Sequence, residues 1–173
     1  MAGRRRVLGP GNGLPGADLM LVGEAPGRHG AERTGVPFSG DASGRNLDRL
    51  LVHAGLSREQ VFITNAVLCN PQTGDGRNDK PSPAELANCR DHLADQIRVV
   101  NPKVVATLGA VALSALAAIA PHGLGLKSAA ARPHPWHGRL LFPLYHPGAR
   151  ARVHRPKGDQ EADFRALARL LGA

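Results

Sequence analysis

Short apolar runs alternate along this chain with segments in which apolar residues recur at a helical spacing. Four runs predict buried strands, because each is only a few residues long and almost wholly apolar. They read LMLV at 19–22, VFIT at 61–64, VVATL at 104–108 and LLFPL at 140–144. Strands that alternate with helices predict an α/β fold: a three-layer sandwich with a central, mostly parallel four-stranded sheet flanked by helices.

The helical segments carry recognisable boundary signals. The first begins at Ser43 or Gly44 and stops at Gly55. The second has the pattern of a capping box, with Ser82 at its start and a glutamate three residues later, and it ends before Asn101-Pro102. An Ala-rich helix follows Gly109, and residues 159–171 predict a closing amphipathic helix.

Two long polar loops follow the first two strands, at residues 23–43 and 69–83. They are rich in Gly, Pro and Asn, and loops of this length inside a compact domain are often functional. Ligands of parallel sheets gather at the carboxyl ends of the strands. We therefore expect the site where residues 23–38, 65–71 and 145–150 meet.

The length and composition suit one globular domain over residues 1–173. Residues 1–17 are basic and then Gly/Pro-rich, which predicts an arm over the surface. The basic start is not followed by an apolar segment, and no stretch is long enough to span a bilayer. We therefore expect a cytoplasmic protein without a membrane partner, and a monomer, because no apolar stripe is left over.

The balance of charge favours a polyanionic partner. The chain has 22 Lys and Arg against 14 Asp and Glu, a formal net charge of +8. In a small domain this favours nucleic acid, although an Arg-rich composition alone would give the same charge. The two cysteines, Cys69 and Cys89, do not suggest a secreted disulfide scaffold.

The glycines after the first strand form neither common nucleotide-binding loop. A P-loop needs Gly-x4-Gly-Lys-Ser/Thr, and residues 23–27 lack the lysine; a Gly-x-Gly-x-x-Gly fingerprint is also absent. The pattern for a metal site is weak, because the eight histidines are scattered. His134 and His137 have no matching acid pair nearby.

Four side chains on the strand-end loops suit a flat heterocycle: Glu24, Phe38, Asn65 and His146. An amide donates and accepts in one plane, so it can read an imide edge such as that of uracil, and an aromatic ring stacks on a base. An imidazole can hydrogen-bond a carbonyl oxygen that gains charge as a glycosidic bond breaks. A carboxylate can orient water or stabilise a sugar cation.

Each of these residues taken singly has a structural alternative. Glu24 could be a solvated turn residue, and Asn65 could cap backbone groups at a strand end. His146 could bond a carbonyl oxygen, and Phe38 could belong to the core. Their joint placement on strand-end loops favours a site.

Six stretches occur in the order of a known family, and the likeness extends over most of the chain, from about residue 9 to 150. They read ADLMLVGEAPG, TGVPFSGDASGRNLDRLL, VFITNAVLCNP, PSPAELANCRDHLADQI, NPKVVATLGAVA and LLFPLYHPGA. With them the chain resembles the uracil-DNA glycosylase superfamily, most closely family 4, the iron-sulfur type. The resemblance implies a central parallel sheet between helices. It also implies a DNA repair enzyme that flips uracil out of DNA and hydrolyses its N-glycosidic bond, leaving an abasic site.

The resemblance also implies roles for single residues. Glu24 takes the family's acidic position in the first motif, and Phe38 takes the position of the ring that stacks on uracil. Asn65 matches the asparagine that reads the uracil edge, and His146 matches the histidine that supports O2 of the leaving base. Two further sets follow: substrate-binding Gly23, Ala25, Pro26 and Gly27, and Pro147, Gly148, Arg150 and Arg152 in a loop that enters the DNA minor groove.

The cysteines depart from the family pattern. Family 4 binds a [4Fe-4S] cluster with four cysteines, of which Cys69 and Cys89 match the last two. Residues 1–8 hold no early pair, and two thiolates cannot hold a four-iron cube. We therefore expect no cofactor unless the missing ligands are supplied. Either further residues precede Met1 or this branch has lost the cluster.

The loops contain two further departures. An acidic residue usual after the first motif has Glu32 as its nearest match, and QTGDGRND lengthens the stretch between the cysteines. A related branch carries a reactive histidine in the loop after the second strand and is trapped covalently on DNA. The loop here, NPQTGDGRNDKP, has no histidine, so we expect turnover.

The leading interpretation is a monofunctional uracil-DNA glycosylase acting on single- or double-stranded DNA. Two alternatives stay open. One is a glycosylase of the same fold for another deaminated base, such as hypoxanthine. The other is a non-catalytic DNA-binding relative.

Overall fold

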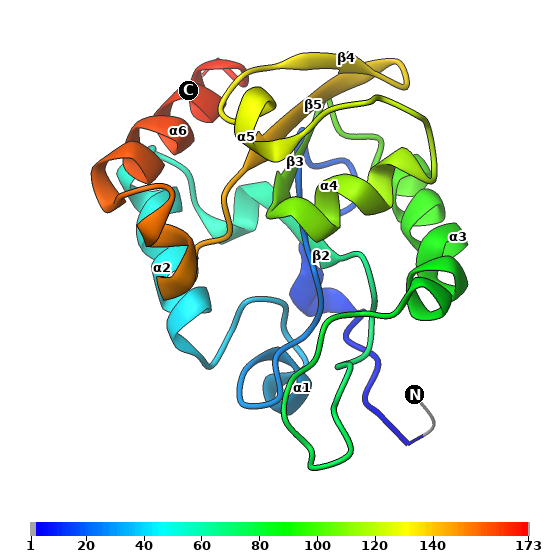
Figure 1. The fold of residues 1–173 in the computed structure, drawn as a ribbon. Helices are drawn as coiled ribbons and strands as arrows, with labels where there is room; N and C mark the ends of the chain where they lie inside the picture. Colours follow the sequence, from blue (N-terminus) through cyan, green and yellow to red (C-terminus); the bar gives the residue numbers. More distant parts are fainter. Residues whose placement is uncertain (1–2, 173) are drawn as a thin grey trace.

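A five-stranded sheet lies between two layers of helices in the computed structural model, which describes residues 3–172 (Figure 1). The strand order is β2-β1-β3-β5-β4. Strands β1, β2, β3 and β5 run parallel, and β4 pairs antiparallel with β5. The strands are β1 (Leu19–Gly23), β2 (Val61–Asn65), β3 (Val104–Leu108), β4 (His134–Trp136) and β5 (Arg139–Leu144). The predicted α/β sandwich is confirmed.

The predicted count of four strands was wrong, because β4 adds a fifth at the sheet edge. This strand has only three residues, and one of them is Pro135, so no apolar run marks it. Pro135 is tolerated because it lies on an edge strand. Two residues with positive φ, His137 and Gly138, connect β4 to β5, as the tightest hairpin turns require. Trp136 is buried and donates from Nε1 to the Ala120 carbonyl at 2.7 Å.

Two helix layers cover the two faces of the sheet. Helices α2 (Ala42–His53) and α6 (Lys157–Arg169) pack on one face, over Leu21, Ile63 and Ala106 among others. Helices α3 (Pro83–Val100) and α4 (Ala110–Ala117) pack on the other face. Strands buried on both faces must be apolar throughout, which is why their sequences show continuous runs. The short helices are α1 (Ala31–Thr34), α5 (Leu126–Ala129), η1 (Pro10–Asn12), η2 (Arg58–Gln60) and η3 (Ala149–Val153).

The predicted capping box of α3 is confirmed. The Ser82 hydroxyl accepts from the Glu85 amide at 3.3 Å, and the Glu85 carboxylate accepts from the Ser82 amide at 2.8 Å. The helix ends at Asn101, which adopts the left-handed conformation. The start of α2 is set by Asp41, whose Oδ1 accepts from the Gly44 amide at 2.9 Å.

The N-terminal segment is attached to the edge of the sheet beside β2. The Val7 amide donates to the Leu68 carbonyl at 2.8 Å, and Val7 is buried. Asn12 is also buried and donates from Nδ2 to the Ile63 carbonyl at 2.8 Å. This arm therefore lies along the body of the protein from Val7 onward.

The strand order places a topological switch between β1 and β3. The chain leaves β1 toward β2 on one side of the sheet, and β3 lies on the other side of β1. Ligands of open α/β sheets bind at such points, outside the carboxyl ends of the strands. Among the helices of residues 3–172, none is both long and apolar enough to cross a bilayer.

Candidate active site

A cavity of about 560 Å³ opens at the carboxyl ends of the strands, between the loops that follow β1, β2 and β5. Its position matches the expectation from the three strand-end loops. Seven residues predicted from the sequence line it: Glu24, Ala25, Pro26, Gly27, Phe38, His146 and Arg150. The fold thus brings together side chains that are more than a hundred positions apart in the sequence.

Gly23 permits a close approach of three elements beside this cavity. It is the last residue of β1 and lies opposite Asn65, the last residue of β2. A Cβ atom on Gly23 would come within 2.5 Å of both Asn65 Oδ1 and the Phe38 ring. Only glycine therefore lets the asparagine and the ring meet at this strand end.

Asn65 does not line the cavity directly but is buried next to Gly23 and Phe38. Only 1% of it is exposed, and its Oδ1 has no hydrogen-bond partner in the part of the chain that the structure describes. A buried acceptor without a donor is costly in a folded protein and calls for an explanation. A donor on a bound ligand is one.

The Phe38 ring lies against the His146 imidazole. The two ring centroids are 5.8 Å apart, and the planes are tilted by 40°. Phe38 has a φ of 49°, a conformation that a bulky residue rarely adopts. The guanidinium of Arg58 donates to the carbonyls of both Pro37 and Phe38, which holds this strained backbone in place.

The hydrogen bonds of His146 fix the tautomer of its neutral ring. Its Nδ1 accepts from the Gly148 amide at 2.9 Å, so the neutral imidazole carries its proton on Nε2. Burial lowers the pKa of His146 from its ordinary value of 6.5, and the nearby Asp41 carboxylate opposes this shift. The neutral ring with Nε2–H is therefore the form present at pH 7.

The loop after His146 is shaped to serve this ring. A Cβ atom on Gly148 would come within 2.7 Å of His146 Nδ1, so a side chain here would displace the imidazole. The Pro147 carbonyl accepts from Asn46 Nδ2 at 2.6 Å, which ties the loop to α2. Arg150 lines the cavity, whereas Arg152 is exposed and lies outside its lining.

Three carboxylates line the cavity: Glu24, Asp41 and Asp79. Burial raises the pKa of Glu24 from its ordinary value of 4.5, and the charge of Lys80 opposes the rise. Asp41 was not predicted from the sequence as a site residue. Its only signal was its place just before a helical periodicity, and that signal indicates an N-cap as readily as a site residue.

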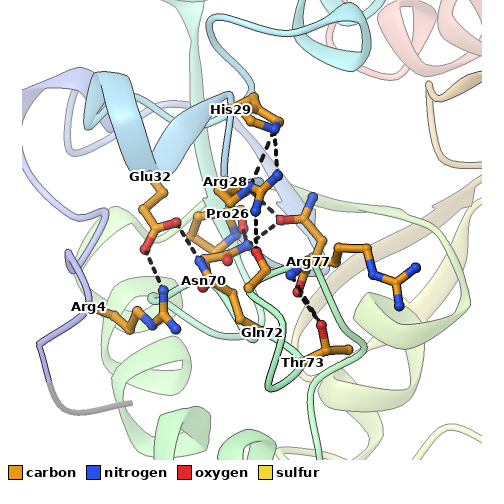
Figure 2. A network of polar contacts seen from close by, with 11 residues as sticks. Arg4, Pro26, Arg28, His29, Glu32, Asn70, Gln72, Thr73 and Arg77 are labelled. Atoms are coloured by element: carbon orange, nitrogen blue, oxygen red, sulfur yellow. Dashed lines mark hydrogen bonds and ion pairs between the residues drawn. The ribbon is translucent and has the colours of Figure 1, made fainter.

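The loop after β2 supplies a further part of the lining that sequence reasoning missed. Asn70 donates from Nδ2 to the Pro26 carbonyl at 2.5 Å and to Asn78 Oδ1 at 2.9 Å (Figure 2). The Arg28 amide donates to the same Asn78 oxygen at 2.9 Å. The missed lining residues are Ala31, Asp41, Ser43, Asn70, Asn78, Asp79, Lys80 and Ala151.

Cys69 and Cys89 come close together but do not form a site for a four-iron cluster. Burial raises the pKa of the Cys69 thiol, and the neighbouring Cys89 adds to the rise. Both thiols are free. Within residues 3–172, no group of three or more His, Cys, Asp and Glu side chains is arranged to hold a metal ion, and a cube needs four ligands. These residues therefore do not fit the cluster.

The fold and the cavity define a class: an open α/β protein with an aromatic ring, an imidazole and carboxylates around a pocket at the carboxyl edge of its sheet. The family model described as "Uracil DNA glycosylase superfamily" matches residues 10–171, and the chain belongs to this superfamily.

Curated relatives of two types are similar to this chain. The Type-4 uracil-DNA glycosylase of Sulfurisphaera tokodaii is 32% identical over 167 residues, 93% of this chain and 73% of the relative. The Type-4 uracil-DNA glycosylase of Thermotoga maritima is 37% identical over 82% of this chain and 69% of its own length. The Type-5 uracil-DNA glycosylase of Thermus thermophilus is 38% identical over 82% of this chain and 64% of its own length.

Proposed function

We propose that this protein is a DNA repair glycosylase that removes uracil from DNA by hydrolysing its N-glycosidic bond. The observation that carries the proposal is the convergence of Glu24, Phe38 and His146 on one cavity, with Asn65 buried beside it. Membership of the uracil DNA glycosylase superfamily supports the same conclusion, as do relatives that are named uracil-DNA glycosylases.

Recognition of the base is proposed to rest on Phe38 and Asn65. The ring offers an apolar face on which a flipped pyrimidine can stack. The Asn65 amide can accept from N3–H of uracil and donate to O4 in one plane. Its unpartnered Oδ1 supports this role, because a bound imide would supply the donor that the folded protein lacks.

His146 is proposed to stabilise the leaving base. When the bond between C1′ and N1 breaks, negative charge grows on uracil O2. An Nε2–H donor that is already in position lowers the barrier without reorganisation. The Gly148 amide on Nδ1 keeps the proton on the opposite nitrogen, so the ring is preset to donate to the base.

Glu24 is proposed to act on the sugar side of the same bond. Positive charge grows on the deoxyribose as the base leaves, and a carboxylate in the cavity can stabilise this charge or hold the attacking water. Lys80 counters the effect of burial on Glu24, which favours the ionised form. Asp41 supplies a second carboxylate on the same cavity.

DNA is the proposed substrate, and Arg150 and Arg152 are proposed to contact it from the loop after β5. The formal charge of +8 favours association with a polyanion. Both arginines lie in η3, directly after the His146 loop, so a strand that delivers a base to the cavity would pass them.

The proposal is tested by incubating the purified protein with oligonucleotides that carry one uracil, in single- and double-stranded form. Free uracil and an alkali-labile abasic site are the expected products. A panel with hypoxanthine, xanthine and thymine in a mismatch defines the range of bases. Release of hypoxanthine but not uracil would establish a different glycosylase, and binding without release of any base would establish a non-catalytic relative.

We also infer that no four-iron cluster takes part, because Cys69 and Cys89 lack further ligands among the described residues. Iron and sulfide analysis of the purified chain tests this inference. An iron and sulfide content far below one four-iron cluster per molecule is expected. A stoichiometric four-iron content with the visible colour of thiolate-bound iron would contradict it.

A further inference from the structure

The loop after β2 folds into a small hairpin of its own, residues 71–80, here called the 71–80 hairpin. Gln72 and Asn78 form an antiparallel bridge. The Thr73 amide donates to the Arg77 carbonyl at 2.9 Å, and the Asp79 amide donates to the Pro71 carbonyl at 3.0 Å. These bonds give a segment rich in Gly and Asn a defined backbone path.

The 71–80 hairpin is fastened to the turn after β1 (Figure 2). Arg28 donates from its amide to Asn78 Oδ1 at 2.9 Å and from Nη1 to the Gly76 carbonyl at 2.5 Å. Asn70 Nδ2 donates to the same Asn78 oxygen and to the Pro26 carbonyl. Because this turn also carries Glu24, the hairpin and the catalytic turn are positioned as one unit.

The 71–80 hairpin carries two cations, of which Lys80 lies at the cavity and Arg77 lies outside it. Lys80 is exposed and lines the cavity together with Glu24 and His146. Arg77 does not line the cavity; its side chain is 76% exposed and pairs with Asp75 at 2.7 Å. The hairpin therefore offers a natural pair of cations that differ in position but not in charge.

Cations from two different loops line this cavity, Lys80 from the 71–80 hairpin and Arg150 from η3. A nucleotide whose base enters the cavity leaves its phosphates at the rim. Contacts to phosphate set the register of a nucleic acid on a protein. Lysine serves such contacts as a flexible point charge.

We propose that Lys80 binds a backbone phosphate next to the extruded nucleotide, and that Arg28, Asn70 and Asn78 hold the 71–80 hairpin so that it reaches this phosphate. The inference rests on the proposed function, because it assumes DNA with a base in the cavity. The DNA backbone would then be contacted from two loops, by Lys80 on the 71–80 hairpin and by Arg150 on η3.

The test compares Lys80→Met with Arg77→Met, which removes the same charge from the same hairpin. Binding to a duplex with a stable abasic-site analogue is measured by fluorescence anisotropy over a range of salt concentrations. Lys80→Met should weaken binding about three- to tenfold and reduce the slope of log K against log salt by about one. Arg77→Met should bind like the wild type, and Lys80→Arg should restore most of the loss.

The positioning part of the proposal is tested with Asn78→Ala, which leaves every charge in place. It removes the acceptor shared by Arg28 and Asn70. A hairpin without this anchor should bind more weakly and show the same reduced salt slope, because Lys80 no longer reaches its phosphate. An unchanged slope in this variant would overturn the positioning role.

The outcomes separate this inference from the proposed function. Equal losses in Lys80→Met and Arg77→Met would indicate diffuse attraction and overturn the specific contact. Normal DNA binding with slower uracil release in Lys80→Met would overturn the phosphate contact and show that Lys80 acts through the ionisation of Glu24 instead. If the wild type releases no uracil but Lys80→Met still binds DNA more weakly and with a smaller salt dependence, the glycosylase proposal fails and the phosphate contact stands.

Discussion

Two asparagines, Asn12 beside β2 and Asn65 at its end, are equally buried but differ in their hydrogen bonds. Asn12, in the N-terminal segment, donates to the Ile63 carbonyl and accepts from the Gly9 amide. Asn65, at the end of the same strand, has no partner for its Oδ1 in residues 3–172. Each is only 1% exposed. We infer from this difference that the first polar group is kept for stability and the second for a ligand.

The same contrast holds for larger regions of the molecule. The buried acceptors and donors without partners in the described chain are Asn65 Oδ1, Asn70 Oδ1 and Thr107 Oγ1. All three belong to the carboxyl-terminal half of the sheet or the loop that leaves it. Elsewhere, buried Gln160 and Asp163 are paired with the Arg155 carbonyl and guanidinium. Buried side-chain atoms without a hydrogen-bond partner therefore gather at the carboxyl edge of the sheet.

The largest effect is expected from removing the imidazole at the carboxyl edge. His146→Ala should lower the single-turnover rate of uracil release about 100- to 1000-fold, as the loss of one preorganised donor does. Binding of DNA should be largely kept. His154→Ala is the matched control, because that histidine is exposed and lies outside the cavity lining. A wild-type rate in His146→Ala would remove the imidazole from the reaction.

Lowering the pH should slow uracil release through the protonation of two groups in the cavity, Glu24 and His146. Burial raises the pKa of Glu24 above 4.5 and lowers that of His146 below 6.5. Glu24 therefore loses its charge at a higher pH than an ordinary glutamate, and His146 becomes protonated at a lower pH than an ordinary histidine. As the pH falls through the pKa of each group, the excision rate should drop by roughly tenfold per pH unit for each group titrated. Rates measured from pH 8 to about 4.5 check this. In His146→Gln the fall should be shallower, and a rate that stays flat would contradict the assignment of both groups.

A substitution in a hydrogen-bonded region outside the cavity should lower the stability of the fold and leave the rate of uracil release unchanged. Ser82→Ala removes the cap of α3 and should lower the free energy of unfolding by about 1 kcal/mol. The rate of uracil release should not change, since Ser82 lies outside the cavity lining. Denaturant unfolding and single-turnover assays on one preparation measure both. A loss of excision without a loss of stability would show that the two regions are not separable.

The fold was predictable from the sequence where burial is two-sided. The core strands β1, β2, β3 and β5 are apolar throughout because helices cover both faces, and Ser82 and Glu85 mark the start of α3 by local chemistry alone. Strand β4 was not predictable: its edge position and length leave only Trp136 buried.

The candidate site was predictable to the extent that its residues follow strands directly. Glu24, Asn65 and His146 stand within two residues of a strand end, and the carboxyl ends of parallel strands share one edge. Lys80 and Asn78 were missed because they reach the cavity through contacts with Arg28 and Asn70. Such contacts depend on how two long loops meet in space, and no spacing in the sequence reveals them.

The central claim is that the unpartnered amide of Asn65 reads the base, whereas the paired amide of Asn12 holds the fold. Both can be replaced by leucine, which has a similar branched shape and no polar atoms. Removing a buried group that has partners costs about 1 to 3 kcal/mol, whereas removing one without partners costs little.

The most direct measurement is therefore the unfolding free energy and the single-turnover rate of uracil release for Asn12→Leu and Asn65→Leu together. Asn65→Leu should unfold like the wild type and lose about 10- to 100-fold in rate, the kinetic equivalent of the lost recognition. Asn12→Leu should be less stable and keep its rate under conditions where it is folded. If Asn65→Leu instead loses stability and releases uracil at the wild-type rate, the amide serves the fold, and the account of the site is wrong.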